Sequence, residues 1–375
     1  MKLTYSLAIA IALGCVGTGW ARDLHSNDDT GAVFVMTNAA DSNEVIAYSR
    51  SPKGDLQERS SFETGGRGSG GLIDPLESQG SLILSQDHSL LFAVNAGSGT
   101  ISAFHVNRSR LSLLDVVSSG GSEPNALALY GDLLYVLNTG GSSGVAGFRV
   151  HDNGRLAPIA NSIRFLSTNT SGAASLSFSP DGRFLVVTER LTNSIDVFRV
   201  HENGKLSPVV VNQDLVPGTF AVTFAPNGSA IVVETGPGGA QNGSTISSYG
   251  VQDDGTLFSI SVGIPTLGAA TCWNVVTPDG RFVYTNNAGS FTISGFAING
   301  NGSLTPLPNT VQATHADGSA NLDMAISADG KFLYSLNAGI GTIGVFGINK
   351  DGSLANLGSI GGLLAKSGLN GIAAY

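Results

Sequence analysis

The chain contains little charge and very little cysteine. Charged residues make up 13% of its 375 residues, and the formal net charge is −9. Globular proteins usually contain about 25% charged residues. Because phosphate binding depends on clustered lysine and arginine, and the sequence has no basic run, we expect no nucleic-acid partner. The two cysteines are Cys15 and Cys272, and we expect the segment around Cys15 to be removed, so no intramolecular disulfide is expected.

A run of apolar residues long enough to span a membrane is also missing. Near the N-terminus, Lys2 precedes an apolar stretch over residues 7–16, which is too short to cross a bilayer, and residues 19–21 form a small-x-small cleavage site. This pattern predicts a signal peptide and a secreted or periplasmic protein. A second interpretation is lipoprotein processing at Cys15, because the residues before it resemble the end of a bacterial lipobox. We divide the chain into a signal peptide (1–21), an N-terminal extension (22–30) and one domain (31–375).

Helical periodicity is missing after residue 25, whereas glycine is abundant, with 51 residues. A unit of about 50 residues recurs seven times along the chain. In each copy an apolar run ends in a polar residue, and the next apolar run ends in an aromatic residue. A turn of the type Asn-Gly-x-Leu follows, in which glycine supplies the positive φ that hairpin turns need. The polar residues at the ends of the runs are Asn38, Asn95, Asn138, Glu189, Thr235, Asn287 and Asn337.

Each unit begins with a further apolar run, for example residues 174–178, which a Pro-x-Gly turn at residues 180–182 closes. Four short strands in a unit of this length are typical of a propeller blade, so the sequence predicts an all-β, seven-bladed β-propeller. Residues 32–36 match the second strand of a unit, but no first strand precedes them. Residues 368–375 match a first strand, but no further strands follow them. We expect the two chain ends to pair in one blade, which closes the ring and removes exposed strand edges.

One face of the predicted propeller is the expected working surface. The loops that lead into the innermost strands and those that follow the second strands share this face, and ligands usually bind there. Most of the polar residues predicted at these positions are amides. The residues expected to contact a small-molecule ligand are Asn125, Asn138, Glu234, Trp273, Asn274, Asn287, Asp323, Asn337, His315 and Arg67.

Glu189 and Glu234 are two glutamates in this ring of amides. Near a low-dielectric channel their pKa values are expected to rise, which suits proton transfer. Alternatively, each carboxylate accepts hydrogen bonds from loop N–H groups and only supports a turn. Arg190 is available to pair with Glu189, although adjacent side chains of a regular strand point to opposite faces.

Metal binding and nucleophilic catalysis receive less support. The amides and glutamates contain enough oxygen atoms for Ca²⁺, but no Asp-rich loop accompanies them, so we expect no metal and no cofactor. His315 is the only histidine in a loop that leads into a first strand, and it is either a working-face residue or an ordinary surface residue. Cys272 has no histidine in a matching register, so core packing is favoured over a nucleophilic role.

The segment SPDGRFLVV at residues 179–187, and the related segments of the other units, resemble the lactonase family of seven-bladed propellers over residues 30–375. That family includes propeller-type 6-phosphogluconolactonases and fungal carboxymuconate cyclases, and its repeat is similar to the YVTN repeats of surface proteins. Its enzymes carry a His-Pro-His segment, a Gly-Pro-Arg-His segment and a later glutamate. Here Glu123-Pro124-Asn125 and residues 171–174 take the places of the first two, without histidine or arginine, whereas Glu189 matches the glutamate.

Two functional hypotheses remain open. The resemblance implies a secreted, lactonase-like hydrolase that acts on a small cyclic ester, such as a sugar lactone or a muconolactone, with Glu189 for proton transfer and Arg190 or Arg67 as the positive group. The alternative is a non-catalytic secreted propeller that binds a ligand or a protein partner through the same face. For both hypotheses we expect a monomer.

Overall fold

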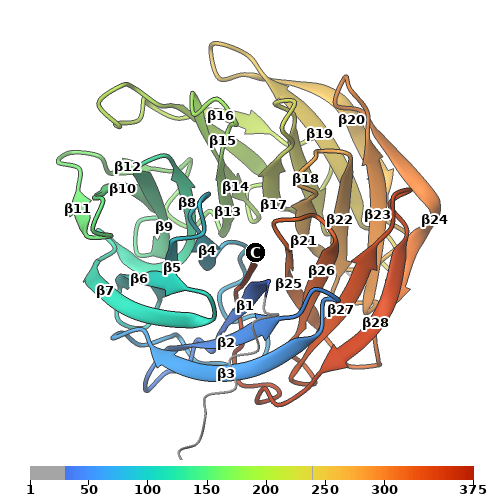
Figure 1. Cartoon of the computed structure of the whole chain (residues 1–375). Coiled ribbons are helices and arrows are strands. Elements are labelled where there is room, and N and C mark those ends of the chain that lie inside the picture. Colours follow the sequence, from blue (N-terminus) through green and yellow to red (C-terminus); the bar gives the residue numbers. More distant parts are fainter. Residues whose placement is uncertain (1–29, 239) are drawn as a thin grey trace, which may run out of the picture.

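The computed structural model describes residues 30–238 and 240–375, so the predicted signal peptide and Cys15 lie outside the described residues. Within these ranges every regular element is a β-strand, and 29 strands form seven sheets. The sheets stand around a central axis (Figure 1). None of the described residues forms a helix long and apolar enough to cross a membrane. The prediction of an all-β, seven-bladed propeller is confirmed.

The blades follow one another along the chain, and their innermost strands contact each other around the axis. From the inside outward, blade 1 contains β29 (Ile372–Ala374), β1 (Gly31–Met36), β2 (Glu44–Arg50) and β3 (Leu56–Glu63). Blade 2 contains β4 (Leu82–Leu84), β5 (Leu90–Asn95), β6 (Thr100–Asn107) and β7 (Arg110–Ser118). Blade 3 contains β8 (Ser122–Tyr130), β9 (Leu133–Gly140), β10 (Gly144–Val150), β11 (Leu156–Pro158) and β12 (Arg164–Phe165), of which the last two both pair with β10.

The remaining four blades each contain four consecutive strands. Blade 4 contains β13 (Ala173–Phe178), β14 (Phe184–Glu189), β15 (Ser194–Arg199) and β16 (Val210–Gln213). Blade 5 contains β17 (Thr219–Phe224), β18 (Ala230–Glu234), β19 (Thr245–Val251) and β20 (Leu257–Pro265). Blade 6 contains β21 (Thr271–Val276), β22 (Phe282–Asn287), β23 (Thr292–Ile298) and β24 (Leu304–Thr314). Blade 7 contains β25 (Asn321–Ile326), β26 (Phe332–Asn337), β27 (Thr342–Ile348) and β28 (Leu354–Ile360).

The two ends of the chain meet in blade 1. Strand β29 pairs antiparallel with β1, with Phe34 opposite Ala373, and in Figure 1 the C-terminus lies at the centre of the ring. Nε of Arg50 donates a hydrogen bond of 3.2 Å to the backbone oxygen of Tyr375. The ring of Tyr375 stacks on that of Phe34, with centroids 6.4 Å apart. The predicted closure of the ring is therefore confirmed.

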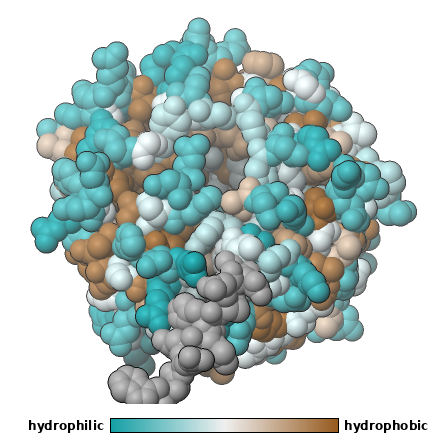
Figure 2. Space-filling view, in the orientation of Figure 1, coloured by the Kyte–Doolittle hydropathy of each residue, from teal (hydrophilic) through white to brown (hydrophobic). Residues whose placement is uncertain are grey.

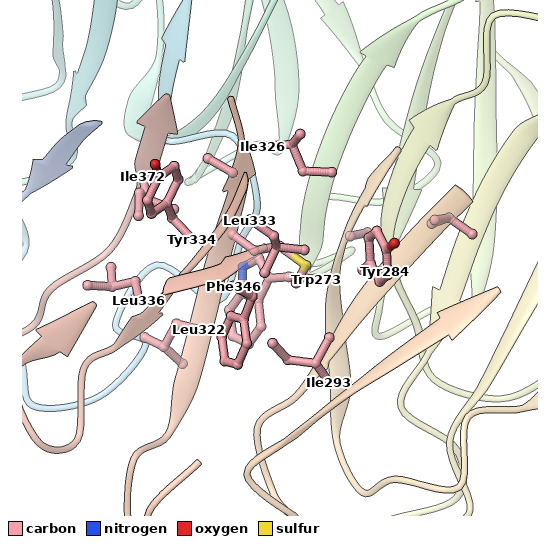
Figure 3. Packing of buried hydrophobic residues seen from close by; sticks show 14 of the residues in the cluster. Trp273, Tyr284, Ile293, Leu322, Ile326, Leu333, Tyr334, Leu336, Phe346 and Ile372 are labelled. Atoms are coloured by element: carbon pink, nitrogen blue, oxygen red, sulfur yellow. The ribbon is translucent and has the colours of Figure 1, made fainter. Parts of the chain in front are cut away.

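Buried aromatic side chains join neighbouring blades. The hydroxyl of Tyr284 in β22 donates to the backbone oxygen of Gly352 in the outer turn of blade 7, at 2.7 Å. Tyr135 makes the same contact from blade 3 to Gly204 of blade 4, at 2.8 Å. A side chain at Gly352 is excluded, because its φ is +85° and a Cβ atom there lies 2.6 Å from the Phe282 ring. Figure 3 shows buried side chains of blades 6 and 7, with Leu333 and Phe346 near Trp273 at the centre of the view and Tyr284 to one side.

At two of the seven polar positions aligned from the sequence, the strand registers show that the equivalent residue is the preceding one. Asn95 is opposite Thr100 as the last pair of its two strands, and Glu234 is opposite Thr245 in the same way. The matching residue of blade 5 is therefore Glu234, and not Thr235. In blade 1 the same comparison gives Thr37 instead of Asn38, because the pair before it is Met36 with Val45. Both errors arose where two polar residues follow each other.

Removal of the closing strand tests the ring directly. Deletion of residues 368–375 leaves the inner edge of β1 unpaired, so we expect aggregation or a large fall in the melting temperature, measured by differential scanning fluorimetry and light scattering. Tyr375→Ala is the control, because it removes the ring stacked on Phe34 but keeps the backbone of β29. A soluble truncated protein that melts within a couple of degrees of the parent contradicts the requirement for closure.

Candidate functional site

A loop between blades 1 and 2 lies at the centre of the ring. We call residues 72–80 the central loop, and the side on which the chain enters the innermost strands the entry face. The backbone N–H of Gln79 donates to Ala174 at the start of β13, and its side chain exchanges two hydrogen bonds with the backbone of Asn274 in β21. Strands β13 and β21 belong to blades 4 and 6. The central loop therefore crosses the entry end of the channel.

Other residues at the entry ends of the inner strands also contact the central loop. Nε1 of Trp273 donates to the backbone oxygen of Ser78 at 2.9 Å. Nδ2 of Asn125 donates to the oxygens of Leu76 and Ala173, at 3.4 and 2.9 Å. The side chains of Trp273 and Asn125 are both buried. Three predicted ligand contacts, Asn125, Trp273 and Asn274, thus bind this loop of the chain itself.

The central loop brings acidic side chains to a cation of blade 4. Glu77 forms a salt bridge with Arg190, whose side chain is 30% exposed. Asp74 lies close enough to both for its pKa to respond to their charges. Burial is the main cause that raises the pKa of Asp74 well above its usual range, the charge of Glu77 adds to it, and Arg190 opposes it. Nδ2 of Asn370 donates to Asp74 at 3.0 Å.

The cluster lies on an unusual backbone and close to further buried titratable groups. Asp74 and Glu77 both have left-handed backbone conformations, with φ of +46° and +45°. Such conformations are uncommon outside glycine, cost free energy and are concentrated at functional sites. Below the cluster, burial raises the pKa of Asp323 to about 7 and that of the Cys272 thiol well above its ordinary value. The entry end of the channel therefore combines one arginine with carboxyl groups of different acidity.

Glu189 lies away from this cluster, at the junction of blades 3 and 4. It is fully buried, and its carboxylate accepts hydrogen bonds from the backbone N–H of Ser167 at 2.9 Å and from the hydroxyls of Ser167 and Thr192. The same N–H of Ser167 also donates to Asp196, at 3.1 Å. Burial, followed by the charge of Glu189, raises the pKa of Asp196 to about 8. The buried pair of Asp196 and Glu189 therefore keeps one proton at neutral pH.

Glu234 occupies the equivalent position at the junction of blades 4 and 5. The hydroxyl of Thr245 donates to its carboxyl group at 2.6 Å, and the side chain is fully buried. Burial, and then the charge of Asp214, raises the pKa of Glu234 to about 8. The hydroxyl of Tyr249 donates to Asp214 at 2.7 Å. This second acidic pair is thus enclosed between blades in the same manner as the first.

The amides of the predicted ring also lie at blade junctions. Asn287 accepts from the hydroxyl of Thr271 at 2.5 Å and donates to Thr292 and Ser294. Asn138 donates to the backbone oxygen of Ser119 at 3.2 Å, and Asn337 donates to Thr342 at 3.1 Å. All three amides are buried, so their hydrogen bonds connect strands and loops of the fold.

Two predicted residues lie at other junctions. His315 is half-buried between blades 6 and 7, where its ring meets that of Phe346 edge to face with centroids 5.4 Å apart. Burial lowers the pKa of His315 to about 4, so the imidazole is neutral near pH 7. The exposed Arg67 donates its backbone N–H to Ser98 in blade 2, at 3.0 Å. Among these ionisable candidates, Arg190 contacts the central loop, whereas Glu189 and His315 lie at other blade junctions.

Sequence reasoning missed Asp74, Glu77 and Asp196. The loop between β3 and β4 lacks any repeat motif, so nothing in the periodic pattern marks residues 72–80 as central. Its length was the available signal, because long loops inside compact domains are often functional. Among the described residues, no three His, Cys, Asp or Glu side chains are grouped as metal ligands are.

The buried acidic pair of blade 4 predicts a pH-dependent stability. The folded state keeps a proton on the pair of Asp196 and Glu189 up to about pH 8, whereas an unfolded aspartate loses its proton near pH 4. Folding therefore becomes less favourable as pH rises between these values. Asp196→Ser introduces the residue that blades 2, 5 and 6 carry at this register. We compare the free energy of unfolding in urea of Asp196→Ser with that of the parent. The difference in favour of the variant is expected to increase by more than about 1 kcal/mol from about pH 5 to about pH 8.

The exposed Asp317 supplies the matched control for this measurement. Asp317→Asn removes a solvated carboxylate, so its effect on stability is expected to be small at every pH. A stability gain of Asp196→Ser that is the same at all pH values contradicts the assignment of a proton to the buried pair.

Comparison with known families and structures places this geometry in context. A family model described as "Lactonase, 7-bladed beta-propeller" matches residues 21–170, 142–272 and 236–362. No curated protein matches the sequence. A solved structure from Bacteroides uniformis, provisionally assigned as a 6-phosphogluconolactonase, has a TM-score of 0.71 and 20% identity over 93% of this chain and 100% of its own.

Two further solved structures are similar. A periplasmic gluconolactonase from Pseudomonas aeruginosa has a TM-score of 0.66 and 18% identity, covering 90% of this chain and 98% of its own. A protein from Lactobacillus plantarum has a TM-score of 0.71 and 16% identity, covering 92% and 98%. At these identities the likeness shows a shared fold. Because the family model matches most of the sequence, the chain belongs to the lactonase family of seven-bladed β-propellers.

Proposed function

We propose that the protein is a secreted lactonase that hydrolyses a small cyclic ester, such as a sugar lactone or a muconolactone, at the entry end of its channel. The observation that carries this proposal is the grouping of Arg190, Glu77 and Asp74 in a chain of the lactonase family. Lactone opening needs a positive group for the developing oxyanion, an acceptor for a proton of water and a donor for the leaving oxygen.

Each of the three side chains suits one of these roles. Arg190 stabilises the negative charge that develops on the carbonyl oxygen when water attacks. Glu77, a carboxylate 58% exposed to solvent, accepts the proton of the attacking water. Asp74 keeps its proton because of its raised pKa and donates it to the ring oxygen as the acyl C–O bond breaks. The product is the open-chain hydroxy acid, and solvent returns the proton from Glu77 to Asp74.

We assign Glu189 a positioning role. The resemblance gives it the place of the family glutamate, but its carboxylate is fully buried and three donors occupy it. One of these donors is Thr192, which lies two residues after Arg190 in the loop between β14 and β15. Glu189 thus supports the loop that presents Arg190 to the entry face.

A non-catalytic, ligand-binding propeller is the second proposal. It is favoured by the hydrogen bonds of the central loop, which occupy Asn125, Trp273 and Asn274 and cover the entry end of the channel. On this view the loop is a structural cap, and a ligand or partner binds its outer surface. The two proposals differ in whether any lactone is turned over.

Turnover of lactones by designed variants distinguishes the proposals. A panel of aldonolactones and muconolactones is assayed by pH-stat with the parent, Asp74→Asn and Arg190→Gln. Asparagine at position 74 keeps the oxygen that accepts from Asn370 but loses the titratable proton, so we expect kcat to fall on the order of 100-fold or more. A similar fall is expected for Arg190→Gln, because the oxyanion loses its positive partner.

Glu189→Gln and Asp317→Asn are the comparison variants. Glutamine keeps the shape and one acceptor oxygen of Glu189. If Glu189 only positions the loop, we expect kcat of Glu189→Gln to fall by less than about tenfold. We expect no change in kcat for Asp317→Asn. Undiminished hydrolysis by Asp74→Asn, or a larger loss for Glu189→Gln than for Asp74→Asn, contradicts the assignment. No hydrolysis by the parent above the buffer rate favours the binding propeller.

A further inference from the structure

The channel is open at the end opposite the central loop. A cavity of about 1420 Å³ lies there, between the ends of inner strands whose beginnings contact the central loop. Its floor contains the last residue of five consecutive inner strands, namely Leu84, Tyr130, Phe178, Phe224 and Val276. These five side chains are apolar or aromatic, which is typical of the floor of a small-molecule site.

The cavity continues outward between blades 2 and 3, where its rim becomes polar. His105 near the end of β6 and His151 directly after β10 contribute to this rim, together with Asp87 and Asp152. On the face that Figure 2 shows, apolar side chains in brown lie among polar ones in teal. The cavity therefore combines an apolar floor with a rim of ionisable groups.

The charges at the rim have one sign. Three aspartates line the cavity, whereas none of the described residues that line it is lysine or arginine. Asp132 is paired with Arg149 at 2.7 Å, which leaves Asp87 and Asp152 as the main charges. Hydrogen bonds from the hydroxyl of Ser85 and from Ser89 lower the pKa of Asp87 to about 2, so this carboxylate is charged at any physiological pH.

Aromatic rings lie where the floor meets the rim. Tyr130 is 43% exposed, and its ring is tilted against that of Phe178 with centroids 6.0 Å apart. Aromatic faces attract cations, and the attraction increases when the cation is partly removed from water. An ammonium group near Tyr130 thus meets both an aromatic face and the negative rim, while an apolar body attached to it reaches the floor.

We propose that this cavity is a second ligand site and that it binds small organic amines, in which a charged ammonium group is attached to an apolar or aromatic body. The negative charge of the rim attracts cations and repels anions, including the hydroxy acid that lactone hydrolysis releases. The site is therefore independent of the chemistry proposed for the entry end, and it can be present whether or not the protein turns over a lactone.

Three indole compounds that differ in charge test this proposal on the parent protein. Tryptamine carries an ammonium group, tryptophol is neutral and indole-3-acetate is an anion. Isothermal titration calorimetry is expected to give a dissociation constant for tryptamine at least tenfold lower than that for tryptophol, with indole-3-acetate weakest. The preference is expected to decrease at high salt, because the rim carboxylates are exposed to solvent. Equal affinities for the three compounds overturn the proposal.

Variants locate the binding site. Asp152→Asn changes an exposed residue of the rim, and the double variant Asp87→Asn with Asp152→Asn removes both unpaired charges. We expect the double variant to lose at least tenfold in tryptamine affinity, the single variant to lose part of that, and neither to change its affinity for tryptophol. Asp317→Asn is the control on the entry face. Unchanged tryptamine binding by Asp152→Asn and by the folded double variant overturns the proposal, as does an equal loss for Asp317→Asn.

Discussion

Pairing of β29 with β1 is the interaction on which the rest of the structure depends. Without it, the inner edge of β1 is unpaired and blade 1 has no innermost strand. With it, each blade must fit between two others. The contacts of Tyr284 with Gly352 and of Tyr135 with Gly204 repeat the same arrangement at two junctions. In both, a tyrosine hydroxyl on the second strand of one blade donates to the outer turn of the next blade. Ring closure thus imposes a common geometry on sequences that differ between blades.

The same constraint explains why the second strands of blades 2, 4, 5, 6 and 7 end in a polar residue. In blade 6 the amide of Asn287 satisfies hydroxyls of its own blade at a buried junction. In blades 4 and 5, Glu189 and Glu234 stand at this register, and each adjoins another acid. A buried acidic pair costs stability unless it holds a proton, so these two junctions are the places where the fold accepts an electrostatic penalty. Glu189, which matches the family pattern, is therefore held by its contacts at the junction of blades 3 and 4.

The sequence predicted what depends on local patterns. Apolar runs, Pro-x-Gly turns and the unmatched strand at residues 368–375 indicated seven blades and the closure of the ring. It did not predict the central loop, because the contacts that hold the loop join residues far apart in the chain, such as Asp74 with Asn370 and Ser78 with Trp273. No periodic signal marks such contacts. Asn125 and Asn274 were expected to face a ligand, and only the structure reveals that a loop of the protein binds them.

The central loop makes the two ends of one channel chemically different. Every inner strand begins on the entry face and ends on the other, so a symmetric ring has two comparable openings. Residues 72–80 cover one of them and supply Asp74 and Glu77 beside Arg190. The opposite opening keeps the apolar ends of the strands, such as Phe224 and Val276. The central loop connects blade 1 to blade 2. Because the pairing of β29 with β1 holds blade 1 in the ring, it also fixes the position from which the central loop starts. Closure of the ring therefore fixes the start of the loop that places Asp74 and Glu77 beside Arg190 at one end of the channel.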